Sequence, residues 1–100
     1  MTLIEQHTSE IQKLCSIYKV KKLYVFGSFT TNHFTDSSDI DLLVDFEPQD
    51  INRYADNYFN LKFGLEKILN RKIDLLENKA IKNPYLRQAI EKDYQLLYAA

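Results

Sequence analysis

Hydrophobic and polar residues follow one another along this chain with two different periods, and the changes of period mark the expected helices and strands. Residues 3–18 carry apolar side chains at helical spacing and predict an amphipathic helix. An apolar run at residues 23–27 predicts a buried strand, and residues 28–36 are expected to form a short helix or turn. A second apolar run at residues 39–46 predicts a second strand, which Glu47-Pro48 ends.

A long helix and a third strand are expected next. Asp50 is placed to cap a helix that runs to about Asn70. The predicted inner face of this helix consists of Ile51, Tyr54, Tyr58, Leu61, Leu65 and Ile68. Residues 72–76 then predict a short third strand.

The last segments complete the predicted fold. Residues 83–93 predict a helix with Asn83 as its cap and Pro84 at its first position. Periodicity does not choose between a helix and an edge strand for residues 94–100. The order α-β-α-β-α-β-α predicts the α/β (α+β) class, with helices packed on a small mixed β-sheet. A length of 100 residues indicates a single domain, residues 1–100.

The amino-acid composition excludes several classes of protein. With 45% hydrophobic and 27% charged residues, the chain is typical of a globular protein. Its single cysteine, Cys15, excludes an internal disulfide and suits the reducing cytoplasm. No apolar stretch approaches the roughly 20 residues that span a membrane, and a signal peptide is not expected. The net charge of −1 argues against direct binding of nucleic acid.

The charges are unevenly distributed. Residues 36–56 include seven acidic residues and only one basic residue, Arg53. So dense an acidic segment repels phosphate unless cations neutralise it, which is expected of a metal site. A solvated loop would carry the same charges, so this feature alone does not choose between the two interpretations.

The residues with candidate chemistry lie at the ends of the expected strands. Gly27-Ser28 follows the first strand, where a tight turn and a helix N-terminus can hold phosphate. Asp39 and Asp41 stand at the head of the second strand and share one face of it, because side chains alternate with period two. Asp74 lies in the third strand and points away from its apolar neighbours. If these two strands are adjacent, three carboxylates converge and can hold two Mg²⁺ ions, with Asp74 also placed as a general base.

Each of these patterns also has a purely structural interpretation. A lone Asp-x-Asp usually ends a strand in solvent, and a glycine after a strand is usually a turn residue. Here the Gly-Ser pair is followed after ten residues by Asp39, and Ser38 stands directly before it. Together with Asp74, this combination favours a catalytic set over three unrelated surface features.

The combined motifs resemble the minimal nucleotidyltransferase (MNT) family of the polymerase-β-like nucleotidyltransferase superfamily. The similarity extends over nearly the whole chain and is carried by Phe26-Gly-Ser28, Ser38-Asp-Ile-Asp-Leu-Leu-Val44 and Arg71-Lys-Ile-Asp-Leu-Leu76. It implies a nucleotidyltransferase-like fold that binds ATP as substrate and Mg²⁺ as cofactor. The implied site consists of Gly27, Ser28 and Ser38 for nucleotide binding, and of Asp39, Asp41 and Asp74 for catalysis and metal binding.

The resemblance also implies a partner. Family members of this size are commonly encoded beside a helical HEPN protein, often a ribonuclease toxin. The implied activity is Mg²⁺-dependent transfer of AMP from ATP to a hydroxyl, that of a tyrosine, on this toxin, which makes the chain an antitoxin. The alternative is a non-catalytic or weakly catalytic antitoxin that neutralises the HEPN partner by binding. It is motivated by Phe29-Thr-Thr-Asn32, where Thr31 replaces an arginine and Asn32 a glycine found in many members.

The remaining candidates carry less chemistry. His7 and His33 share no ligand spacing and are expected at or near the surface, whereas Cys15 is expected in the core. Most of the seven Tyr and six Phe are also expected to fill the core. The long helix carries more aromatic residues than one face can bury, so they either fill the core or form an exposed patch for a partner. They are Tyr54, Tyr58, Phe59 and Phe63.

Overall fold

A single mixed sheet organises the chain in the computed structural model, which describes residues 2–27 and 39–100. The strands within these ranges are β1 (Val20–Phe26), β2 (Ile40–Phe46), β3 (Ile73–Glu77) and β4 (Gln95–Ala99). They are arranged in the order β3-β2-β1-β4. β1 pairs antiparallel with β2 and β4, whereas β2 and β3 run parallel.

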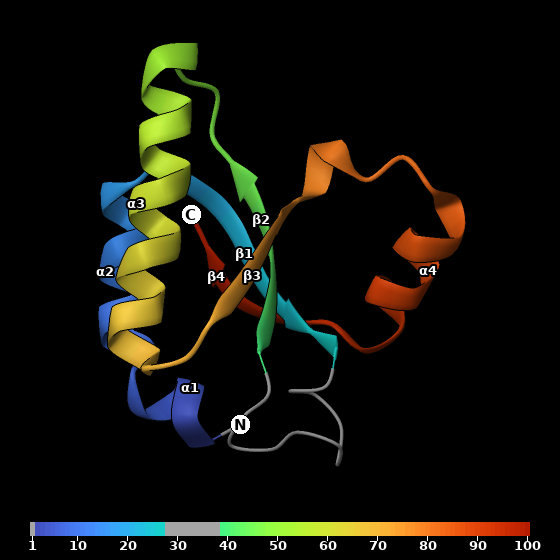
Figure 1. Ribbon diagram of the computed structural model, residues 1–100, viewed down its shortest axis with the longest axis horizontal. Helices are drawn as coiled ribbons and strands as arrows, with labels where there is room; N and C mark the ends of the chain where they lie inside the picture. The colour runs from blue at the N-terminus through green and yellow to red at the C-terminus, as the bar shows by residue number, and fades with distance from the viewer. Residues whose placement is uncertain (1, 28–38) are drawn as a thin grey trace.

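Helices cover both faces of this sheet. Those of the described ranges are α1 (Thr2–Gln6), α2 (Thr8–Ile17), α3 (Ile51–Leu69), the 3₁₀ turn η2 (Asn78–Ala80) and α4 (Pro84–Asp93). α2 and α3 pack side by side on one face, and α4 lies on the other (Figure 1). The predicted class, a small mixed sheet with helices packed on it, is therefore confirmed.

The main core lies between the sheet and the α2–α3 layer. Every second residue of β2 faces this layer, so that Ile40, Leu42 and Val44 are at most 1% exposed. The helices contribute Ile11, Cys15, Leu61, Leu65 and Leu69. The burial of Cys15 confirms its predicted place in the core.

The face of the sheet beneath α4 has a smaller apolar layer. Leu43 of β2 and Ile90 of α4 are buried outside the main core. Tyr24 of β1 stacks on Tyr94, with ring centroids 4.4 Å apart. This layer fixes α4 over the side of the sheet that also carries Asp41 and Asp74.

The start of the chain differs from the prediction. The expected single helix at 3–18 is two helices separated at His7. The Thr8 hydroxyl donates to the carbonyl oxygens of Ile4 and Glu5, at 3.3 and 3.1 Å, and so competes with the main-chain helix pattern. The first strand also begins earlier than residue 23, because pairing with β2 extends back to Val20.

The long helix α3 begins and ends where the sequence predicted, but its first turn differs from the prediction. Asp50 is at the N-cap position, yet its side chain makes no capping hydrogen bond. Ile51 was predicted on the inner face and is instead 82% exposed, because the sheet ends before the first turn of α3. The helix ends at Asn70 in a left-handed conformation, with φ of 52°.

The closing segments settle the open alternative. α4 begins as predicted, with the Asn83 side chain accepting hydrogen bonds from the backbone N–H groups of Tyr85 and Leu86. Residues 95–99 form the edge strand β4, which settles the choice between a helix and an edge strand that periodicity left open. The short helix or turn expected at 28–36 lies outside the described residues.

Candidate active site

Three elements meet at one edge of the sheet and bring the predicted site residues together. β2 and β3 are parallel and therefore begin at the same edge, where Asp41 is the register partner of Asp74. β1 arrives antiparallel, and its last residue, Phe26, pairs with Asp41. Gly27 thus comes next to the start of β2, although it is 14 positions from Asp41 in the sequence.

Gly27 is in direct contact with the Asp41 side chain. It has a φ of +74°, a conformation that favours glycine. A β-carbon added there would collide with Oδ2 of Asp41 and lie 3.3 Å from its Cγ. The glycine is therefore needed both for the turn and for the space in which the Asp41 carboxylate lies.

The two strand carboxylates share the face opposite to the main core. Their neighbours in β2 and β3, Ile40, Leu42, Ile73 and Leu75, all point into the main core. Asp74 is exposed and Asp41 half-buried, and Asp39, which precedes β2, is exposed as well. The face assigned to Asp74 from the sequence is confirmed, and β2 and β3 are indeed neighbours.

The surroundings of Asp41 disfavour the ionised form of its carboxyl. Burial raises the pKa of this carboxyl, and the negative charges of Asp74 and then Asp39 raise it further. The two other acids are therefore close enough to act on Asp41. A cation bound between them would relieve this repulsion.

The structure also bears on the expected metal site. Carboxylate oxygens are the ligands that Mg²⁺ prefers, so the chemistry of the three acids fits this ion. Over residues 2–27 and 39–100, however, no three His, Cys, Asp or Glu side chains already form a group that could hold a metal. Metal binding by Asp39, Asp41 and Asp74 therefore stays a prediction. Ser28, Ser38, His33 and the Phe29–Asn32 segment lie outside the described residues.

Two interactions that the sequence did not predict fix the start of β3. The Glu66 carboxylate accepts a hydrogen bond from the backbone N–H of Ile73 at 3.0 Å, directly before Asp74. The Tyr58 hydroxyl donates to the carbonyl oxygen of Leu75 at 2.6 Å, directly after it. Burial, with smaller effects of Glu77 and Asp74, raises the pKa of Tyr58 and keeps it protonated as a donor. Neither contact has a sequence signal, because both depend on how α3 lies across the sheet.

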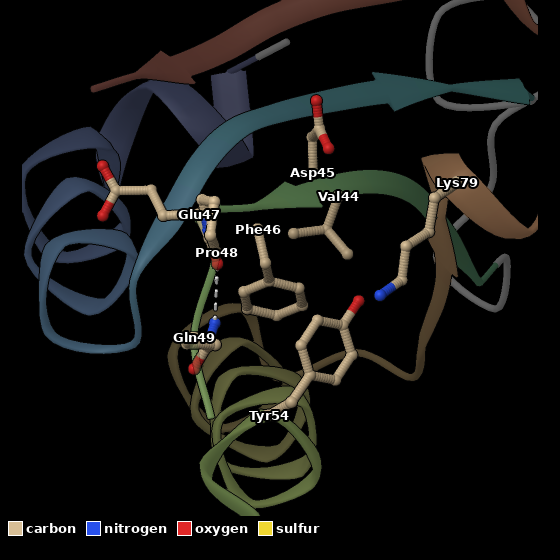
Figure 2. Close-up of a pocket in the computed structure, with 8 residues that line it drawn as sticks. All are labelled: Val44, Asp45, Phe46, Glu47, Pro48, Gln49, Tyr54 and Lys79. Atoms are coloured by element: carbon tan, nitrogen blue, oxygen red, sulfur yellow. Dashed lines mark hydrogen bonds between the residues drawn. The ribbon is translucent and has the colours of Figure 1, made fainter. Parts of the chain in front are cut away.

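A pocket of about 240 Å³ lies at the opposite end of β2. It is lined by residues 44–49 together with Tyr54 and Lys79 (Figure 2). The Lys79 ammonium lies 4.1 Å from the centre of the Tyr54 ring. Burial and a hydrogen bond with Glu77 raise the pKa of Tyr54, so its hydroxyl stays neutral. Of the predicted site residues that the structure describes, none lines this pocket.

The other candidates have structural roles. His7 lies within 3.1 Å of Glu10 on the surface, and burial raises the pKa of Cys15 to about 12. Both observations agree with the predicted places of these side chains, His7 near the surface and Cys15 in the core. No helix within the described ranges is long and apolar enough to cross a membrane.

Comparison with known sequences supports what the geometry indicates. Residues 10–97 match the nucleotidyltransferase domain family. Two similar proteins are from Methanocaldococcus jannaschii and are both called "Putative protein adenylyltransferase". One is 42% identical over 76 residues, which cover 76% of this chain and 75% of the relative. The other is 44% identical over 77 residues, which cover 76% and 74% of the two proteins.

Solved structures have the same fold. One is named "putative minimal nucleotidyltransferase", with a TM-score of 0.75, 26% identity, and coverage of 92% of this chain and 90% of that one. A toxin–antitoxin structure with AMP-PNP has a TM-score of 0.70 at 23% identity. This match covers 93% of this chain and 73% of that one. A chain in a complex of tri-AMPylated Shewanella oneidensis HEPN toxin with MNT antitoxin has a TM-score of 0.65 at 21% identity. This match covers 96% of this chain and 72% of that one.

The family match, the sheet order and the clustering of Gly27, Asp39, Asp41 and Asp74 at one edge agree with one another. The match extends over more than half of the chain, and it includes every residue of this edge. The chain belongs to the nucleotidyltransferase domain family.

Proposed function

We propose that this chain is an antitoxin that transfers AMP from ATP to a tyrosine hydroxyl of a HEPN-domain toxin. The observation that carries the proposal is the position of the Asp41 carboxylate, between Gly27 and its register partner Asp74. A glycine turn beside paired carboxylates suits a substrate that consists of phosphates and a divalent cation. The complex of an AMPylated HEPN toxin with MNT antitoxin, which shares this fold, supports the choice of partner.

In the proposed site, each residue has a separate task. Gly27, Ser28 and Ser38 bind the nucleotide, and Asp39, Asp41 and Asp74 would hold Mg²⁺. When bound, this ion neutralises charge on the phosphates of ATP. Asp41 is half-buried and its ionised form is disfavoured by its neighbours, so a bound cation would restore it as a carboxylate.

The reaction replaces a phosphoanhydride bond of ATP by a phosphoester bond to tyrosine. The tyrosine oxygen forms a bond to the α-phosphorus of ATP, the bond from this phosphorus to the oxygen bridging to the β-phosphate breaks, and pyrophosphate leaves. Asp74 is exposed on the open face of β3 and can accept the proton of the tyrosine hydroxyl. Catalysis would come from positioning and from charge neutralisation.

The test is a transfer assay with the HEPN-domain protein that we expect to be encoded beside this gene. The chain, ATP and Mg²⁺ are incubated with this protein, and its mass is measured. We expect a gain of one or more AMP units, which the double variant Asp39→Asn/Asp41→Asn should abolish. Asp45→Asn is the matched control, because Asp45 lies on the same strand and face but at the other end, and it should leave the transfer intact.

A second candidate is neutralisation of the toxin by binding alone. It is favoured by Thr31 and Asn32, which stand where many family members have an arginine and a glycine. In this case the Asp39→Asn/Asp41→Asn variant would still form the complex and still suppress toxicity in cells. A HEPN partner that the wild-type chain inhibits fully without adding AMP to it would exclude the transfer mechanism and keep the antitoxin role.

A further inference from the structure

Helix α3 buries only one of its sides. Leu61, Leu65 and Leu69 are at most 2% exposed and face the sheet. The side away from the sheet carries Phe59 and Phe63, and a row of apolar residues at intervals of four continues from them through Ala55 to Ile51 in the exposed first turn of the helix. This row, called the α3 stripe below, consists of Ile51, Ala55, Phe59 and Phe63.

The exposure of the stripe is unusual for aromatic side chains. Phe59 is 51% exposed and Phe63 is 58% exposed, and their rings stack on each other with centroids 6.1 Å apart. Large apolar side chains that gather on a surface mark interaction sites. Phe59 and Phe63 lie on the far side of α3 from the sheet, whereas Asp41 and Asp74 lie on the opposite face of that sheet. The nucleotidyltransferase site therefore does not account for the stripe.

The charges beside the stripe indicate what it binds. Asp56 and Lys67 are both exposed. With about 3.6 residues per turn, both lie on the same side of the midline between Phe59 and Phe63, and Lys67 continues the row four positions after Phe63. In an antiparallel pair of α3 helices with Phe59 opposite Phe63 of the second copy, Asp56 comes opposite Lys67 of that copy. Two-fold symmetry repeats both contacts, so the surface is complementary to itself in shape and in charge.

We propose that the α3 stripe is a homodimer interface, on which a second copy of this chain docks antiparallel through its own stripe. Phe59 and Phe63 form the centre of the interface, and two Asp56–Lys67 pairs flank it. α3 has 19 residues, a length of about 28 Å, which suffices for this contact. The two nucleotidyltransferase sites then face outward on opposite sides of the dimer and remain accessible.

The test measures the oligomeric state in solution. Sedimentation velocity of the full chain is recorded up to about 1 mM, because interfaces smaller than about 1,200 Å² are usually weak. We expect a concentration-dependent species of twice the 11.8 kDa monomer mass. Phe59→Ser/Phe63→Ser should abolish it while leaving the melting temperature nearly unchanged, because both rings are already half in solvent. A wild-type chain that stays monomeric, as expected if the stripe binds a helix of another protein, would overturn the proposal.

Charge exchange tests the antiparallel register. Asp56→Lys or Lys67→Asp alone should weaken the dimer about tenfold, because two attractive pairs become repulsive. The double variant should restore it. Asp93→Lys and Lys92→Asp on α4 change the net charge by the same amounts and should have no effect. A dimer that survives the phenylalanine variant, or a double exchange that fails to restore it, contradicts this interface.

Discussion

The carboxylate of Asp41 lies against the backbone of Gly27, at a position that a β-carbon on this residue would occupy. Gly27→Ala should therefore displace Asp41 and strain a backbone with a φ of +74°. We expect a loss of stability of about 1–2 kcal/mol and loss of AMP transfer. Chemical denaturation measures the first effect and the transfer assay the second.

The second glycine of the chain provides the control. A β-carbon at Gly64 would lie 2.9 Å from Cδ1 of Leu14, the end of a flexible side chain that can move. Gly64→Ala also gains helix propensity, so its net effect on stability should stay below about 1 kcal/mol. Full activity of Gly27→Ala, or inactivity of Gly64→Ala, would contradict the assignment of Gly27 to the site.

The charge of Asp41 should reduce stability in the absence of a cation. Its pKa in the folded chain is raised above the ordinary value of 3.8 by burial, Asp74 and Asp39. The stabilising contribution is therefore present below that value and is lost as the pH rises through the folded-state pKa. At pH 7, Asp41→Asn should stabilise the metal-free chain, by no more than about 1 kcal/mol because the group is only half-buried and solvent screens part of its interactions. Thermal unfolding of both proteins from pH 3 to pH 7 measures the difference, which should vanish at the acidic end.

Addition of Mg²⁺ should make the wild-type chain more stable than the Asp41→Asn variant. A cation that binds only the folded state raises the melting temperature, by an amount that grows with the logarithm of its concentration once the site is filled. We expect MgCl₂ to stabilise the wild-type chain and to have little effect on Asp41→Asn, whereas Asp45→Asn should respond like the wild type. An equal response of all three proteins would show that Mg²⁺ does not bind at Asp41.

The N-terminus of α4 depends on one side chain. Asn83 accepts hydrogen bonds from Tyr85 N–H at 2.8 Å and Leu86 N–H at 3.3 Å. Asn83→Ala should destabilise the chain by about 1 kcal/mol. Asp50→Ala is the matched variant, since Asp50 is the N-cap of α3 but makes no such bond. Its effect on urea unfolding should be clearly smaller, and equal losses would contradict the difference between the two caps.

The single thiol should be unreactive in the folded chain. Cys15 is fully buried, and burial raises its pKa from 9.0 to about 12. Because the raised value favours the protonated thiol, this contribution to stability is complete below pH 9 and is lost between about pH 9 and 12. Alkylation by iodoacetamide at pH 8 should follow global unfolding and accelerate at least a hundredfold in urea. Rapid labelling in native buffer would contradict this burial.

Local signals predicted α4 and the strands around the site. Asn83 before Pro84 marks a helix start by side-chain chemistry alone, and the apolar runs around Asp41 and Asp74 mark strands by composition. These signals arise from residues that are neighbours in the sequence, so they do not depend on how the rest of the chain folds. The positions of Gly27, Asp39, Asp41 and Asp74 at strand ends were predictable for the same reason.

Other features depended on contacts that the sequence does not encode locally. Residues 95–99 form a strand because β1 offers them a free edge, with Leu23 pairing to Tyr98. The division of the aromatic residues of α3 was also undetermined. Tyr58 reaches the Leu75 carbonyl, while Phe59 points into solvent, since the sheet covers only one side of the helix.

The sequence by itself determined which residues can carry the chemistry, since Gly27 and the three acids are defined by their types and spacing. Only the tertiary structure decided that β2 and β3 run parallel and in register, which brings Asp41 opposite Asp74. It also decided that Gly27 touches Asp41, and that one side of α3 is left uncovered. Residue type and spacing set what a side chain can do, whereas its neighbours follow from long-range packing, which no local pattern specifies.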